Sequence, residues 1–375
     1  MTHPVYCPLS TDAAEEAKIG LTGSGWSGIV GHEGVIGRLR ESILRGRLPH
    51  ACLFVGPDGI GKELVARELA RTLLCASATD EACGQCAACH KVDHGNHPDV
   101  TFVRRIERGA KGERKRQIVI DQVREEIQQP IGYKPFEGRY KVFVVAEADR
   151  MTEEAQNCLL KTLEEPPPHS LLILVAGRLE PFVDTVVSRC QVVRFRALGT
   201  EQVERILTEG HGLDAATARA LGRLSEGSPG RALRYHAEGA YETTLWLLGE
   251  LARTGPGGEF VVADELMGRL KEAGATLEDT RERVRPVLDL LTLAWRDLLF
   301  RASGYGEELL TWGDGCEAVA GVAEGLDAPA AGRLTELALE AREQLDANAN
   351  LKLLLENLVL DTVALLRGRE PLPAR

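Results

Sequence analysis

The sequence predicts a parallel α/β domain followed by two all-helical regions. Over roughly the first 196 residues, short apolar runs rich in β-branched residues alternate with segments of helical periodicity. This alternation is typical of a parallel sheet covered by helices. The expected strands are Ala51–Gly56, Val100–Arg104, Lys141–Val145, Leu171–Ala176 and Cys190–Arg194. Helical patterns between them include Lys62–Leu74, Ile120–Gln129 and Glu153–Glu164.

After Phe195 the strand signals stop. Three short helices set off by glycines are expected next, over Thr200–Glu209, Ala215–Leu224 and Pro229–Ala237. A glycine-rich break at residues 255–258 then leads into long helical patterns that end with Asn350–Leu366. In this last pattern Leu351, Leu354, Leu355, Leu358 and Leu365 share one helical face. The sequence therefore predicts a small helical domain and a larger helical one.

Length and composition limit the class of protein. With 375 residues the chain exceeds the usual size of a single hydrophobic core. Its content of 44% hydrophobic and 27% charged residues is ordinary for a soluble protein, and a cytoplasmic location is expected because the N-terminus lacks an export signal pattern. The net charge of -11 argues against a surface that is basic throughout, so any DNA contact is expected to be local.

A phosphate-binding loop is predicted directly after the first strand. Gly56, Gly59, Gly61 and Lys62 have the spacing at which backbone N–H groups cradle a pyrophosphate and the lysine reaches the outer phosphates. The next position normally holds a Ser or Thr whose hydroxyl binds Mg²⁺, but here it is Glu63. The sequence predicts a P-loop that lacks one magnesium ligand.

The third expected strand ends where a second magnesium ligand belongs. Ala146 occupies the place of the first acidic residue of the usual pair, and an alanine cannot anchor the ion. Glu147 stands where a water-activating base would be, although Glu147 and Asp149 are equally interpreted as a solvated strand end. Two missing ligands make appreciable ATP hydrolysis improbable, since one lost stabiliser costs on the order of 100- to 1000-fold in rate.

Four of the nine cysteines lie within fifteen positions of each other. Cys75, Cys83, Cys86 and Cys89 have the spacing C-x₇-C-x₂-C-x₂-C, which predicts a structural zinc site with a closed shell of four thiolates. The alternatives are free thiols, or His90 as a ligand in place of Cys75.

Two further features are ambiguous on their own. Arg189, in Ser188-Arg189-Cys190, is more often a surface ion-pair partner than a functional residue when it is taken in isolation. The basic run Arg104–Arg116 is interpreted as a solvated loop or hairpin.

Taken together, the motifs resemble the AAA+ subunits of the bacterial DNA polymerase III clamp loader. The motifs are the P-loop, the cysteine cluster, the Ile118–Arg124 segment, Glu147-Ala148-Asp149, Leu163-Glu164-Glu165-Pro166-Pro167, Ser188-Arg189-Cys190 and Asn348–Leu353. Within that family, Glu63 and Ala146 resemble the delta-prime branch, because the ATP-hydrolysing gamma/tau branch keeps both magnesium ligands.

The resemblance implies a particular architecture. It consists of a RecA-like AAA+ core that carries the zinc-binding insertion, a helical lid, and a C-terminal collar through which five subunits form a ring. The corresponding residues are 1–27 for an N-terminal extension, 28–197 for the core with its insertion at 75–90, 198–240 for the lid and 255–370 for the collar. The implied partners are the gamma/tau and delta subunits, the sliding clamp and primed DNA.

The resemblance also implies roles for single residues. Arg189 matches the finger that reaches in trans into a neighbour's ATP site, and Arg231 matches a lid arginine that contacts nucleotide in active relatives, with lid packing as its alternative. Where the family usually carries a polar sensor after the fourth strand, this chain reads Leu174-Val175-Ala176-Gly177. The expected function is a component of the polymerase III holoenzyme that does not hydrolyse ATP alone and whose ATP binding is doubtful. The rival interpretations are an active gamma/tau-type ATPase and a zinc-dependent DNA-binding protein that uses the basic run.

Overall fold

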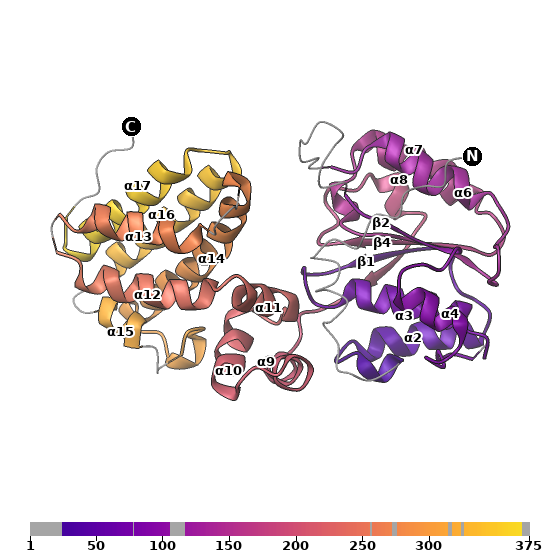
Figure 1. Ribbon diagram of the computed structural model, residues 1–375, viewed down its shortest axis with the longest axis horizontal. Helices are drawn as coiled ribbons and strands as arrows, with labels where there is room; N and C mark the ends of the chain where they lie inside the picture. Colours follow the sequence, from indigo (N-terminus) through magenta and orange to yellow (C-terminus); the bar gives the residue numbers. More distant parts are fainter. Residues whose placement is uncertain are drawn as a thin grey trace. The chain divides into compact units, whose positions relative to one another are not determined.

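The computed structural model shows two compact units (Figure 1). It describes residues 25–77, 79–105, 117–255, 257–271, 276–313, 317–323 and 326–369. Nearly all of the expected N-terminal extension, and the basic run beyond Arg105, lie outside these residues. The first unit comprises Met1–Ala218 and Glu226–Gly230, and the second comprises Arg219–Ser225 and Arg231–Arg375. The expected lid is therefore divided between the two units, and the separation into core, lid and collar stays a prediction.

The first unit is built on a five-stranded parallel sheet with the strand order β2-β3-β4-β1-β5. The strands are β1 (Ala51–Val55), β2 (Val100–Val103), β3 (Lys141–Val145), β4 (Ser170–Ala176) and β5 (Gln191–Arg194). The predicted parallel α/β fold is thus confirmed. Because all strands run the same way, the residues that follow β1, β2, β3 and β4 lie along one edge of the sheet.

Helices cover both faces of this sheet, and β1 shows why its sequence is continuously apolar. Leu53 and Val55 pack in one core cluster, whereas Cys52 and Phe54 pack in the cluster on the opposite face. Figure 1 shows α2, α3 and α4 on one side of the sheet and α6, α7 and α8 on the other. These helices are α2 (Glu33–Leu44), α3 (Lys62–Leu74), α4 (Ala87–Asp93), α5 (Ile120–Val123), α6 (Gln129–Ile131), α7 (Glu153–Glu164) and α8 (Asp184–Val187).

Two predicted helices contain a π-helical turn. The turn η2 (Arg124–Gln128) joins α5 to α6, and η4 (Ile206–Gly210) continues α9 (Thr200–Arg205). Pro130 follows η2 and has no N–H to donate to a helical ladder. Short 3₁₀ turns also occur in this unit, η1 (Trp26–Gly28) and η3 (Ala148–Arg150).

The second unit is helical throughout its described part. Its elements are α12 (Ala240–Arg253), α13 (Glu259–Leu270), α14 (Leu277–Ala302), η5 (Glu307–Leu309), α15 (Glu317–Ala323), α16 (Ala328–Asp346) and α17 (Leu351–Leu366). Helices α10 (Ala215–Leu224) and α11 (Pro229–Ala237) each contribute residues to both units. The predicted leucine stripe of α17 is buried. Within the described ranges, no helix has the length and apolar character needed to cross a membrane.

A buried arginine fixes the turn between α16 and α17. Arg281 of α14 donates hydrogen bonds to the backbone carbonyls of Leu345, Asn348 and Ala349, and Asn350 caps α17 by accepting from the N–H groups of Lys352 and Leu353. The Asn348–Leu353 motif noted in the sequence therefore forms the connection between α16 and α17 and the first turn of α17.

Candidate functional site

The P-loop lies between β1 and α3. Steric constraints explain why glycine occupies three of its positions. A Cβ on Gly56 would lie 2.6 Å from the carbonyl oxygen of Phe195, so only glycine allows this approach. Gly59 and Gly61 have φ angles of 70° and 95°, in the left-handed region that favours glycine. The loop therefore has the backbone conformation that its sequence predicts.

Lys62 bonds to the loop on which it stands. Its side chain is 5% exposed, and its Nζ donates to the carbonyl oxygens of Gly56 and Pro57, each at 2.6 Å. The carboxylate of Asp58 lies 3.7 Å from the same nitrogen. A phosphate would have to compete with these three oxygens for the lysine charge.

Glu63 is buried in an ion-pair network at the position of the missing magnesium ligand. Its carboxylate pairs with Arg104, which follows β2, and with Arg67 one turn further along α3 at 3.5 Å. The amide of Gln122 donates to the carbonyl of Arg104 at 2.6 Å and so fixes the end of β2. Burial lowers the pKa of Arg67, while the charge of Glu63 opposes that change. The Glu63 carboxylate is thus committed to neutralising two arginines.

The end of β3 carries carboxylates without the geometry of a magnesium site. Glu147 adopts a φ of 48° and pairs with Arg105 at 3.2 Å and with Arg150 at 3.3 Å. Asp149 accepts a hydrogen bond from the N–H of Gly177 at 3.2 Å. Burial raises the pKa of Asp149, and the nearby carboxylate of Asp58 adds to the effect. The carboxylates of Asp149 and Asp58 therefore lie near each other at this end of the sheet.

A segment of the expected lid is hydrogen-bonded to the P-loop inside the first unit. The hydroxyl of Ser228, which is 1% exposed, donates to the carbonyl of Asp58 at 2.7 Å. The N–H of Gly230 donates to the carbonyl of Gly59 at 2.8 Å. Arg231 follows directly and is the first residue of the adjoining part of the second unit.

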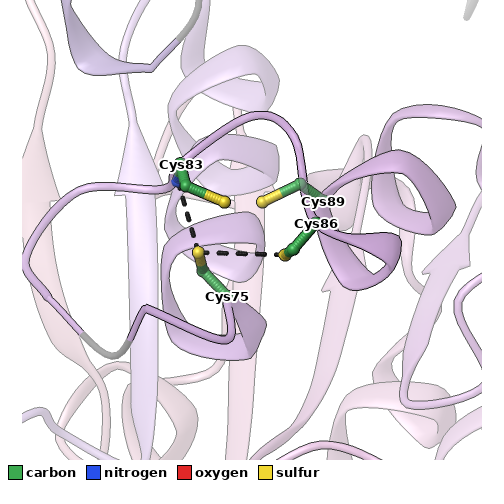
Figure 2. A group of neighbouring side chains, drawn as sticks. All are labelled: Cys75, Cys83, Cys86 and Cys89. Atoms are coloured by element: carbon green, nitrogen blue, oxygen red, sulfur yellow. Dashed lines mark hydrogen bonds between the residues drawn. The ribbon is translucent and has the colours of Figure 1, made fainter.

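Four cysteines converge at the end of α3 and the start of α4. The Sγ atoms of Cys75, Cys83, Cys86 and Cys89 all lie within 4.8 Å of one another, and Figure 2 shows the side chains pointing toward a common centre. Four thiolates around a zinc ion at about 2.3 Å would be about 3.8 Å apart, within the 4.8 Å limit, so a modest contraction of the group would fit a tetrahedral metal ion. His90 is exposed and does not belong to the group.

The chemistry of Cys75 also suits a metal ligand. Burial raises the pKa of its thiol, but the N–H of Cys83 and the hydroxyl and N–H of Ser77 stabilise the thiolate more strongly and bring the pKa to about 6. A thiolate is the form that binds metal. The seven-residue spacing before Cys83 is therefore compatible with Cys75 as the fourth ligand.

The insertion is attached to the N-terminal end of the core. The indole N–H of Trp26, a residue only 3% exposed, donates to the carbonyl of Asp80 at 2.9 Å. Arg40 of α2 pairs with the Asp80 carboxylate at 2.8 Å. The loop between Cys75 and Cys83 consequently contacts both η1 and α2.

Arg189 lies between α8 and β5 with its side chain 35% exposed. One guanidinium nitrogen donates to the carbonyl of Thr185 at 3.0 Å, and the other to the carboxylate of Glu164 at 2.7 Å. Among the described residues, Arg189 bonds to Thr185, Ser188 and Glu164, and none of these belongs to the P-loop. Arg189 is thus held by Thr185 and Glu164 at a partly exposed position.

Two contributors to the site were missed by sequence reasoning. Arg104 was assigned to a solvated basic run, yet it is the partner of Glu63. Glu164 was noted only as part of a motif, yet it holds Arg189. The sequence around each residue could have indicated its role. Arg104 ends a predicted strand, and Glu164 places a negative charge at the C-terminal end of a helix, where the helix dipole is unfavourable to it.

We expect Glu63→Ser, which restores the hydroxyl of the usual P-loop pattern, to destabilise the protein without creating an ATPase. The substitution leaves Arg104 and Arg67 partly buried without their carboxylate, a loss worth about 3 kcal/mol. Urea unfolding measures the stability, and phosphate release with Mg²⁺ measures hydrolysis. Glu63→Gln, which keeps an acceptor oxygen, serves as the control and is expected to lose less. A stable variant with magnesium-dependent hydrolysis would contradict this account of Glu63.

Comparison with known proteins gives a consistent result. The family model described as DNA polymerase III, delta subunit, matches residues 31–199. DNA polymerase III subunit delta' of Bacillus subtilis is 30% identical over 326 residues, which cover 86% of this chain and 93% of that protein. Subunit tau of Escherichia coli is 34% identical over 206 residues, which cover 53% of this chain but only 30% of tau.

Solved structures of lower similarity include a DNA polymerase III, gamma subunit-related protein from Thermotoga maritima. It has a TM-score of 0.46 and 17% identity, and the match covers 89% of this chain and 99% of that one. The full-length relationship to the Bacillus subtilis protein is the decisive finding. This chain belongs to the AAA+ clamp-loader family of bacterial DNA polymerase III.

Proposed function

We propose that this chain is a delta-prime-like clamp-loader subunit that does not hydrolyse ATP itself and that supplies Arg189 in trans to a neighbour's ATP site. The observation that carries the proposal is the burial of Glu63 between Arg104 and Arg67, at the position where an ATPase needs a magnesium ligand. A carboxylate that neutralises two arginines is not available to hold a metal ion.

The remaining P-loop contacts support the same function. Lys62 is bonded to the carbonyls of its own loop, and Ser228 and Gly230 hold the expected lid segment against that loop. Ala146 removes the second magnesium ligand. Because phosphoryl transfer depends on charge stabilisation by the metal and the lysine, this site is expected to preserve the fold rather than to turn over ATP.

Arg189 has the properties that a finger in trans requires. It is exposed, it stands on a short connection between two packed elements, and its guanidinium is already oriented by Thr185 and Glu164. An arginine supplied by a neighbouring subunit is worth about 10³–10⁵ in rate for phosphoryl transfer. Arg231 would then act in lid packing, since its own chain lacks a competent site.

The proposed partners follow from the family. The collar would join this chain to gamma/tau and delta subunits in a five-membered ring, and the ring would open the sliding clamp and place it on primed DNA in the cytoplasm. Contact with DNA would be made to backbone phosphates inside the ring, without sequence readout. The length relationships favour the delta-prime branch, because the chain covers 93% of the delta' relative and 30% of tau.

Two rival functions predict different experimental results. A gamma/tau-type ATPase would hydrolyse ATP as a purified single chain, and Lys62→Ala would abolish that activity. A zinc-dependent DNA-binding protein would bind bare duplex strongly and with a steep salt dependence, through Arg104–Arg116. The pairing of Arg104 and Arg105 with Glu63 and Glu147 reduces the charge available for such binding.

For the cysteine cluster we propose a structural zinc ion. Four protein thiolates close the coordination shell and leave no open position for a substrate, so zinc would hold the insertion in place rather than take part in a reaction.

Replacing Arg189 by alanine tests the role in trans. We expect ATP turnover at the site that Arg189 completes to fall by roughly 10³-fold or more, while the loader still assembles. Single-turnover hydrolysis by the reconstituted clamp loader resolves that site as a separate slow phase. Arg205→Ala is the matched control, because Arg205 is also exposed and forms a surface ion pair, to Glu209 at 3.9 Å. Unchanged turnover in Arg189→Ala would remove the proposed role.

Removing one thiolate tests the metal. Cys86→Ser is expected to reduce the zinc content from about one ion per chain to near zero and to lower the melting temperature. The emission of Trp26 should change as well, because its indole is bonded to the insertion. Cys158→Ser, a cysteine outside the cluster, is the control and should keep its zinc. A Cys86→Ser protein with full zinc content and an unaltered melting curve would argue against the site.

A further inference from the structure

The side chain of Glu164 forms an ion pair with Arg189 outside the hydrophobic core. It is 52% exposed, it ends helix α7, and its carboxylate accepts a hydrogen bond from Arg189 at 2.7 Å across 25 positions of sequence. A carboxylate at a helix C-terminus interacts unfavourably with the helix dipole. The unfavourable interaction with the helix dipole is offset when a positive charge lies beside the carboxylate, and Arg189 provides that charge.

The position of Glu164 is rigid because α7 is held at both ends. Thr152 caps the first turn by accepting from the N–H of Ala155. The helix stops at Glu164 because Pro166 and the two prolines after it cannot continue it. The inner face of α7 is buried through Leu159 and Leu163 in the same core cluster as Val186 of α8.

The connection that carries Arg189 is fixed to the same helix. The side-chain amide of Gln156, 2% exposed, donates to the carbonyl of Pro181 at 2.9 Å and accepts from the N–H of Val183 at 2.9 Å. These bonds hold the start of α8 against α7. Glu164 and Arg189 are therefore carried by elements that move together, so the carboxylate has a constant position relative to the arginine.

We infer that Glu164 is a positioning residue for Arg189, an inference that rests on the role in trans proposed above. One guanidinium nitrogen is held by the carbonyl of Thr185 and the other by the carboxylate of Glu164, so the planar group is oriented before any nucleotide arrives. An arginine that is already oriented loses less conformational freedom when it meets a phosphate.

The weakness of the pair is part of this role. Both side chains are substantially exposed. An exposed ion pair changes the equilibrium constant for the paired arrangement by a factor of about five at most. A guanidinium has five N–H donors, and Thr185 and Glu164 each engage one terminal nitrogen, so other donors remain for a phosphate. Glu164 consequently orients Arg189 without withdrawing it from the γ-phosphate of the neighbour.

A pair of substitutions in the reconstituted clamp loader tests this inference. We expect Glu164→Ala to slow the phase of ATP hydrolysis assigned to Arg189 by about threefold to fivefold, with kcat lowered and KM for ATP unchanged, because the contact acts on the transition state of a nucleotide bound elsewhere. Glu164→Gln retains an acceptor oxygen at the same place and should stay within about twofold of the wild type. The matched control is Glu165→Ala, since the neighbouring Glu165 is exposed and takes part in none of the ion pairs found among the described residues.

The same change in an Arg189→Ala background separates the possible outcomes. If Glu164 acts through Arg189, Glu164→Ala causes no further slowing once the arginine is gone. An equal slowing in both backgrounds, or no effect of Glu164→Ala when Arg189 is present, overturns the positioning role while the role in trans stands. If Arg189→Ala itself leaves turnover unchanged, the role in trans fails and the positioning role fails with it. Gel filtration and thermal melting of each variant show that the subunit still folds and assembles.

Discussion

The ion pairs of Glu63 with Arg104 and Arg67 determine what the phosphate-binding loop can do. They tie the first turn of α3 to the end of β2, at the carboxyl edge of the parallel sheet where nucleotides bind in this class of fold. A buried carboxylate between two arginines is costly to disturb, because removing it leaves positive charge without a partner. The loop is consequently stable in its own right and does not depend on magnesium or phosphate for its charge balance.

The rest of the first unit adapts to this arrangement. Lys62 bonds to carbonyls of the loop, the lid segment bonds to the same loop through Ser228 and Gly230, and Asp58 and Asp149 bring negative charge to the side where an outer phosphate would lie. These contacts give the loop partners from within the first unit.

The groups that remain available to other molecules lie away from that loop. Arg189 is exposed on a connection that α7 holds in place, and the cysteine cluster stabilises an insertion that contacts Trp26 and Arg40. This distribution suits a subunit that contributes rigid surfaces and one charged group to an assembly. Under the proposed function, it would account for a sequence that departs from an ATPase at the metal ligands and yet retains Ser188-Arg189-Cys190.

The sequence by itself determined the five strands, the limits of several helices such as α3 and α7, the glycines of the P-loop and the clustering of the cysteines. These features depend on periodicity, on turn chemistry and on ligand spacing, all of which act between residues close in the chain. Only the tertiary structure decided that Glu63 pairs with Arg104, 41 positions away, that Arg189 is held by Glu164, and that Cys75 rather than His90 completes the cysteine group. The reason is physical. The packing of helices and strands determines which distant side chains meet, and the local sequence pattern around a residue does not contain that information.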